Sequence, residues 1–140
     1  MIYITGDLHG EIERLESKAV KKLKKGDTLI VCGDFGFVWD GSEREKKVLK
    51  KLGKQKYRIL FVAGCHDNYD LLESYPTIEL CGGQVRQISG NLYELLRGEV
   101  YEIDGKTVFA FGGGTSDDEH LREEGVTWWK NEMPDDTEYE

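Results

Sequence analysis

The sequence predicts an α/β fold in which a parallel sheet unit comes first and a mixed, hairpin-rich sheet follows. Up to Pro76, apolar runs alternate with stretches of helical periodicity, which is the pattern of parallel strands joined by crossover helices. Beyond Pro76, short apolar runs are separated by glycines and by Asn or Asp turns, which favours hairpins. A chain of 140 residues has the size of one domain and buries about two-thirds of its unfolded surface. We therefore predict a single domain over residues 1–140.

Three apolar runs in the first half are the predicted parallel strands. They occupy residues 1–4, 28–32 and 58–63. The run at 28–32 is apolar nearly throughout, as expected of a parallel strand that is covered on both faces. The alternation of strands and helices implies right-handed crossovers between neighbours in one sheet.

Helical segments follow the first two of these strands. Residues 11–25 carry four apolar residues at helical spacing and end at Gly26, which predicts one helix over this range. Residues 42–45 read Ser-Glu-Arg-Glu, a capping box that opens a second helix. That helix is expected to end at Gly53.

The chain changes character after the third strand. Asp67 or Asn68 can cap a short helix that ends before Pro76. Five short strand-like runs follow, at residues 78–81, 84–88, 92–96, 100–103 and 107–111. The glycine-containing turns between them predict an antiparallel or mixed sheet.

Each predicted parallel strand ends in a glycine turn that carries metal-type ligands. The first turn holds Asp7 and His9, the second holds Asp34, and the third holds Cys65 and His66. Parallel strands deliver their carboxyl ends to one edge of a sheet, so the three turns should converge. Carboxylate oxygens and imidazole nitrogens are suitable ligands for a divalent metal ion.

The order Asp-x-His-Gly, then Gly-Asp-x-Gly, then Gly-x-His-Asp resembles the calcineurin-like metallophosphoesterase family, over most of the chain. This resemblance implies a β-sandwich flanked by helices and a phosphoesterase with a dinuclear-type metal site. It implies that Asp7 and His9 bind the first metal, that Asp34 bridges both metals, and that position 65 binds the second. It also implies that His66 protonates the leaving oxygen or stabilises charge in the transition state.

The sequence departs from the family pattern in two ways. Cys65 stands where the family has a metal-binding Asn, and the later family histidines have no counterpart. The chain has only His9, His66 and His120, and we expect His120 to be a solvated side chain in an acidic loop. Two hypotheses follow: a phosphoesterase of impaired activity, or a catalytically inactive relative that binds a metal, a nucleotide or a protein. We expect the chain to correspond to a family member truncated at its C-terminal side.

The resemblance implies divalent metal ions as cofactors, with manganese favoured and iron, zinc or magnesium as alternatives. A Cys65 thiolate would shift the preference toward zinc or iron, whereas a side chain too short to reach would leave the second metal site empty. We expect the empty site. The substrate would be a phosphorylated small molecule or a phosphoprotein. Gly113 and Gly114 either cradle phosphate oxygens or simply form a tight exit from a strand.

Charge and composition limit the other function classes. Residues 1–116 hold 17 acidic and 17 basic residues, whereas residues 117–140 hold ten acidic and two basic ones. We expect this acidic tail to be a solvated or frayed end, and nucleic-acid binding is not indicated. No apolar run reaches the roughly 18 residues of a membrane span, and no signal segment is visible. Three widely spaced cysteines do not form a disulfide framework, so we expect a cytoplasmic protein.

Aromatic residues stand out in two predicted loops. Three of them lie in residues 33–41, where they either line a pocket or pack into the core. Trp128 and Trp129 form the largest apolar patch of the acidic tail, and we expect them to pin that segment to the body.

Overall fold

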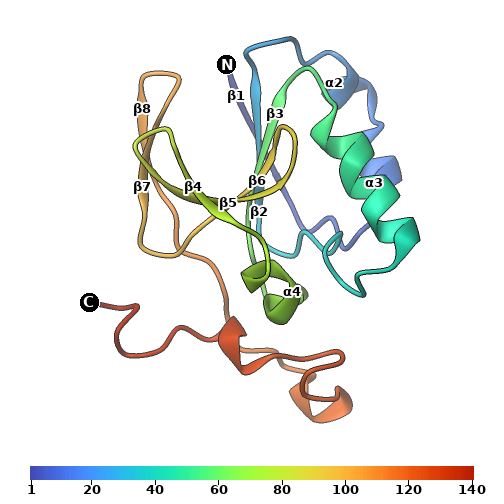
Figure 1. Cartoon of the computed structure of the whole chain (residues 1–140), viewed down its shortest axis with the longest axis vertical. Helices are drawn as coiled ribbons and strands as arrows, with labels where there is room; N and C mark the ends of the chain where they lie inside the picture. Colours follow the sequence, from blue (N-terminus) through green and yellow to red (C-terminus); the bar gives the residue numbers. More distant parts are fainter.

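The computed structural model describes every residue from 1 to 140, and most of the chain is built around one six-stranded sheet (Figure 1). Its strands are β1 (Ile2–Gly6), β2 (Thr28–Cys32), β3 (Arg58–Val62), β4 (Thr77–Leu80), β5 (Gly83–Ser89) and β6 (Leu92–Leu95). The spatial order is β1-β2-β3-β6-β5-β4. Strands β1, β2, β3 and β6 are parallel, and β5 and β4 are antiparallel to their neighbours. The predicted α/β class, with a parallel unit followed by hairpins, is confirmed.

Helices cover one face of this sheet, as Figure 1 shows for α2 and α3. The helices are α1 (Ile12–Leu15), α2 (Lys18–Lys21), α3 (Glu43–Gly53) and α4 (Tyr69–Glu73). Successive strand residues point to opposite faces, so alternate residues of β2 and β3 enter the helix-side core. Leu29, Val31, Ile59 and Phe61 belong to this core, together with Leu49 and Leu52 of α3.

A small second sheet covers part of the other face. It is the hairpin of β7 (Val100–Ile103) and β8 (Lys106–Phe109). Tyr101 and Ile103 of β7 pack with Ile30, Leu60 and Val85 of the large sheet in a second apolar core. The two packed sheets with helices outside form the sandwich that the family resemblance implied.

The single helix expected over residues 11–25 is wrong, because the segment forms two short helices. Ser17 lies between α1 and α2, and its Oγ accepts a hydrogen bond from the Val20 N–H at 3.4 Å. This cap favours a new helix start in place of a continuous helix. The apolar residues Leu15 and Leu23 are nevertheless both buried, as their spacing indicated.

The predicted capping box at the start of α3 forms in part. Ser42 Oγ accepts from the Glu45 N–H at 3.2 Å. The Glu45 carboxylate, however, accepts from the backbone N–H groups of Trp39, Asp40 and Gly41, at 2.5, 2.9 and 2.9 Å. Glu45 therefore shapes the preceding loop, because three N–H donors converge on one side chain.

The aromatic residues of that loop mainly pack into the core. Phe35 and Phe37 are buried, and the Phe35 ring stacks on Phe61 with centroids 4.0 Å apart. Trp39 is only half-buried, and it meets Trp129 edge to face at 5.3 Å. The packing interpretation holds fully for Phe35, whereas Phe37 and Trp39 also line an open pocket.

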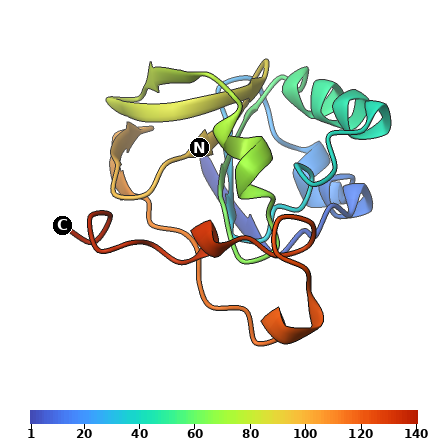
Figure 2. The ribbon, with the colours of Figure 1, turned by 60° about the horizontal axis from the view of Figure 1, so that its bottom comes forward.

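The acidic tail crosses the lower edge of the sheet in Figure 1 and comes to the front in Figure 2. Its middle is fixed to the body, so the expectation of a solvated end is wrong there. Trp129 is 4% exposed and Glu132 only 1%, which confirms the tryptophan anchor for Trp129. Arg97 donates to the Asn131 and Glu132 carbonyls, and Asn131 donates to Glu73 of α4 at 2.7 Å. Polar contacts between residues far apart in the sequence fix the tail, and such contacts cannot be predicted from local periodicity.

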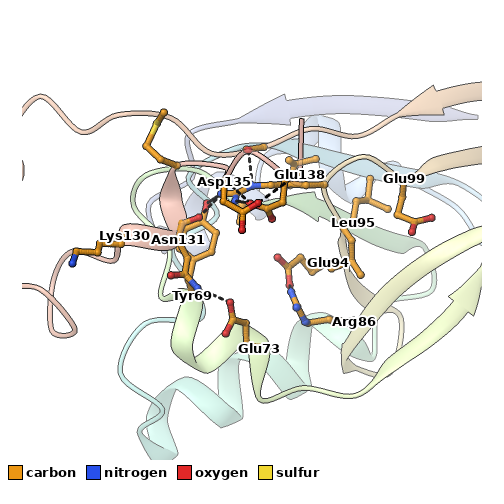
Figure 3. Close-up of a pocket in the computed structure, with 16 residues that line it drawn as sticks. Tyr69, Glu73, Arg86, Glu94, Leu95, Glu99, Lys130, Asn131, Asp135 and Glu138 are labelled. Carbon is orange, nitrogen blue, oxygen red and sulfur yellow. Dashed lines mark hydrogen bonds and ion pairs between the residues drawn. The ribbon is translucent and has the colours of Figure 1, made fainter. Parts of the chain in front are cut away.

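A cavity of about 540 Å³ lies between α4, the end of β6 and the tail (Figure 3). On one wall Arg86 donates to the buried Glu94 carboxylate at 3.1 Å. Burial raises the pKa of Glu94 to about 7, against the opposing effect of Arg86.

None of the helices combines the length and the apolar composition that a membrane crossing requires.

Candidate metal centre

Backbone hydrogen bonds hold the three predicted ligand turns together at one edge of the sheet. The Asp7 N–H donates to the Gly33 carbonyl at 3.2 Å, and the His9 N–H donates to the Asp34 carbonyl at 2.9 Å. The Gly33 N–H in turn donates to Val62, the last residue of β3, at 3.0 Å. The turns continue the pairing of the parallel strands, so their convergence follows from the sheet order.

Asp67 joins the second turn to the third. Its buried carboxylate accepts from the N–H groups of Phe35, Gly36 and Gly64, at 3.2, 2.7 and 2.9 Å. Burial raises the pKa of Asp67 to about 6, although the three N–H donors favour the charged form. Of the two caps considered for α4, Asn68 is the one that forms, with Oδ1 accepting from Leu71 at 3.1 Å. Asp67 therefore acts as a brace for the site.

Three of the residues expected at the site have left-handed backbone conformations. The φ angles are 51° at Asp7, 49° at His9 and 47° at Asp34. Residues other than glycine rarely adopt positive φ, and such conformations tend to cluster at functional sites. Here they turn the chain sharply away from the strand ends and toward a common point.

Gly64 allows the third turn to approach the second. A Cβ atom at this position would collide with the Asp34 carboxylate and with the Asp34 backbone nitrogen. Only glycine leaves room for the contact that follows, in which the His66 N–H donates to Asp34 Oδ1 at 3.0 Å. The sequence pattern showed a glycine here, and the structure supplies the reason.

His9, Asp34 and His66 bring one ligand atom each to a common point, with all three atoms within 4.8 Å of one another. His66 Nδ1 lies 3.1 Å and His9 Nε2 lies 3.8 Å from Asp34 Oδ2. Since a carboxylate only accepts, His66 Nδ1 is the donor in its hydrogen bond to Asp34. The structure thus places His66, predicted as a catalytic group, among the possible ligands.

Asp34 is held in its charged form. Burial alone would raise its pKa, but the His66 backbone N–H, the His66 ring and His9 together lower it below the usual value. A charged carboxylate between two imidazoles is a donor set that divalent Mn, Fe and Zn accept. The residues present therefore fit a divalent metal.

Cys65 lies at the edge of this group. Its Sγ is 3.7 and 4.0 Å from the two Asp34 oxygens and 3.3 Å from His66 Nδ1. Burial and the negative charge of Asp34 raise the pKa of the Cys65 thiol. Without a metal, Cys65 is therefore a neutral thiol.

The remaining expected site residues are not part of the cluster. Asp7 is exposed, its carboxylate makes no hydrogen bond, and it does not join the group of three. The Gly113 N–H donates to the Ala63 carbonyl and the Gly114 N–H to Glu132, both at 2.9 Å. Both N–H groups are thus used in backbone hydrogen bonds, so the arrangement does not support phosphate binding by them. His120 is exposed, as expected, and does not belong to the group of three.

The family model for calcineurin-like phosphoesterases matches residues 1–139. The chain belongs to the calcineurin-like phosphoesterase family. This family acts on phosphate esters and typically binds divalent metals, in agreement with the donor set at the strand ends. A comparison with curated proteins and one with solved structures found no match.

One polar residue of this calcineurin-like phosphoesterase site was missed from the sequence. Arg122 has a side chain that is only 9% exposed, and its Nη1 donates to the Cys65 carbonyl at 3.1 Å and to the Thr127 carbonyl at 2.8 Å. It also contacts Ser116 Oγ and forms an ion pair with Glu132 at 3.6 Å. The only available signal was a single arginine within an acidic stretch, which also occurs on solvated surfaces.

An open pocket of about 460 Å³ begins at the two histidines of the phosphoesterase cluster, and we refer to it as the histidine pocket. It is lined by His9, Gly10, Ile12, Gly36, Phe37, Trp39, Asp40, Ser42, Arg44, Glu45, Val48 and His66. The pocket has the volume of a small-molecule site.

Proposed function

We propose that this protein hydrolyses phosphate esters with a divalent metal held by His9 and Asp34, with His66 either as the third ligand or as the group that protonates the leaving oxygen. The observation that carries the proposal is the convergence of three ligand atoms within 4.8 Å at the end of the histidine pocket. Membership of the calcineurin-like phosphoesterase family supports the same reaction class. The proposed substrates are phosphorylated small molecules or phosphoproteins.

We propose manganese as the metal, with iron, zinc and magnesium as alternatives. One tightly held metal per chain is expected, since only one group of three donors forms. Cys65 and Asp7 are proposed as further ligands of weaker effect. The raised pKa of the Cys65 thiol opposes the thiolate that a second metal would need there.

The metal would lower the pKa of a bound water and neutralise phosphate oxygens. Asp34 holds the His66 ring through Nδ1, which leaves Nε2 as the nitrogen that can exchange a proton with the substrate. The His66 side chain is 37% exposed, so the ring can reach a ligand in the histidine pocket. We propose that His66 either binds the metal or delivers a proton to the leaving oxygen. One ring nitrogen cannot do both, because a nitrogen that binds a metal carries no proton.

Turnover of 4-nitrophenyl phosphate with added Mn²⁺ tests the proposal, together with metal content after purification. Asp34→Asn should abolish both metal retention and turnover, because the central carboxylate loses its charge. Asp136→Asn is the matched control, since Asp136 is exposed and makes no hydrogen bond. Unchanged turnover in Asp34→Asn would contradict the mechanism. Metal binding without turnover of any phosphate ester would instead favour the catalytically inactive metal-binding relative.

A further inference from the structure

The histidine pocket has an apolar wall, and the residues of this wall have no side-chain atoms that could bind a metal. Ile12, Phe37, Trp39 and Val48 line it, and they come from α1, from the loop before α3 and from α3 itself. Phe37 is buried and the other three are half-buried, so they present apolar surface without closing the pocket. A flat apolar group lying here would bury surface that is otherwise in contact with water.

The acidic groups of this pocket have hydrogen-bond partners within the protein, whereas its one arginine side chain has none. The acidic residues Asp40 and Glu45 are already engaged, since their carboxylates accept backbone N–H groups from residues 39–42. Arg44 is the only lysine or arginine that lines the pocket, and it makes no ion pair and no hydrogen bond. It is exposed at the first turn of α3, so its guanidinium is free to bind an anion.

We infer that the histidine pocket selects small-molecule phosphate esters whose alcohol part is flat and apolar and carries a second anionic group, bound by Arg44. The inference rests on the proposed function, because the phosphate is placed at His9, Asp34 and His66. The substrate phosphate would lie at His9 and His66, where the pocket begins, and the second anion would lie against Arg44. A guanidinium suits this role because it binds carboxylate or phosphate through two parallel N–H groups.

The pocket volume distinguishes the small molecule from a phosphoprotein. A volume of about 460 Å³ is that of a drug-sized ligand, and a folded phosphoprotein surface would not fill it. The second anion can be a carboxylate or another phosphate. Either group offers the same paired oxygens to Arg44, and probes that carry one or the other separate the two.

Binding of non-hydrolysable phosphonates tests the inference by calorimetry with saturating Mn²⁺. The probes are methylphosphonate, benzylphosphonate, 4-carboxybenzylphosphonate and 4-phosphonobenzylphosphonate. We expect the benzyl compound to bind more tightly than the methyl compound. A second anion on the ring should add about fivefold in affinity, as for a partly exposed ion pair.

Two variants locate the effect. Arg44→Gln should remove the fivefold gain from the second anion and leave benzylphosphonate binding unchanged. Lys47→Gln removes the same charge from the same helix outside the pocket, so it should change neither. Both positions are exposed on α3, and neither substitution should affect folding.

The possible outcomes separate this inference from the proposed function. Equal affinity of the wild type for benzyl and 4-carboxybenzyl compounds, or a gain that survives in Arg44→Gln, would overturn the Arg44 subsite alone. If only the carboxylate probe or only the phosphonate probe gains affinity, the second anionic group of the substrate is a carboxylate or a phosphate, respectively. Failure of the metal-loaded wild type to bind any phosphonate would overturn the phosphoesterase function itself, and the subsite with it.

Discussion

Arg122 donates a hydrogen bond from its buried guanidinium to the backbone carbonyl of Cys65, 57 residues earlier in the chain, at 3.1 Å. The acidic tail is thereby attached to the turn that carries His66. Because the same guanidinium also binds Thr127, Ser116 and Glu132, the tail and the site turn share one polar centre. Arg122 is in this sense a positioning residue for the third site turn.

Loss of this contact should loosen the third turn. In Arg122→Ala we expect the rate of Cys65 alkylation by iodoacetamide to rise several-fold, because the half-buried thiol becomes more accessible. Peptide mass spectrometry measures this rate, with the exposed Cys32 as the internal reference. Lys130→Ala is the control, since Lys130 lies in the same segment but pairs only with exposed Glu124. An unchanged Cys65 rate in Arg122→Ala would contradict the positioning role.

Asp67→Asn should destabilise the fold although it preserves size. An amide has one acceptor oxygen and an NH₂ group, and the NH₂ would face N–H donors that Asp67 now satisfies. Leaving one or two buried N–H groups without a partner should cost about 2–3 kcal/mol in unfolding free energy. Urea denaturation measures this loss, and Asp136→Asn should show almost none. A variant as stable as the wild type would mean that Asp67 is not a brace.

Stability should fall as the pH rises toward neutrality. Burial raises the pKa of Glu94 from 4.5 to about 7, so the folded chain holds this proton more firmly than the unfolded chain does. The resulting stabilisation is complete below about pH 4.5 and is lost as the pH passes through 7, a change of roughly 3 kcal/mol. Urea denaturation at pH 5 and pH 8 in the presence of chelator measures the difference.

The Glu94→Gln variant identifies the source of this pH dependence. Its stability should change less between pH 5 and pH 8 than that of the wild type. Some dependence should remain, because the pKa of Asp67 is raised in the same direction, to about 6. An identical pH dependence in wild type and variant would show that Glu94 does not cause it.

Metal stoichiometry should report on position 65. We expect the wild type to retain at most one metal ion per chain under reducing conditions, since only one group of three donor atoms forms and Cys65 lies outside it. Cys65→Asn places an amide oxygen there, which needs no deprotonation, and occupancy should rise. Elemental analysis after gel filtration measures both. Two tightly bound metals in the wild type would contradict this prediction.

Several features of the molecule could be predicted from short stretches of the sequence. The apolar runs at β1, β2 and β3 and the helical periodicity between them determine a parallel unit. The glycine turns after these strands place Asp34 and His66 at one edge, because parallel strands end on the same side. Local propensity and periodicity act over a few residues, and a single sequence reports them directly.

Other features were decided only by tertiary structure. The return of β6 beside β3, the brace formed by Asp67, the attachment of the tail by Arg122 and the separation of Asp7 from the cluster all depend on where distant segments meet. A buried carboxylate or guanidinium is stable only where several donors or acceptors surround it. Some of these partners are distant in the sequence: Phe35 and Gly36 lie 32 and 31 residues from Asp67, and Cys65 lies 57 residues from Arg122. No pattern of neighbouring residues encodes these distant partners, so tertiary packing selects them.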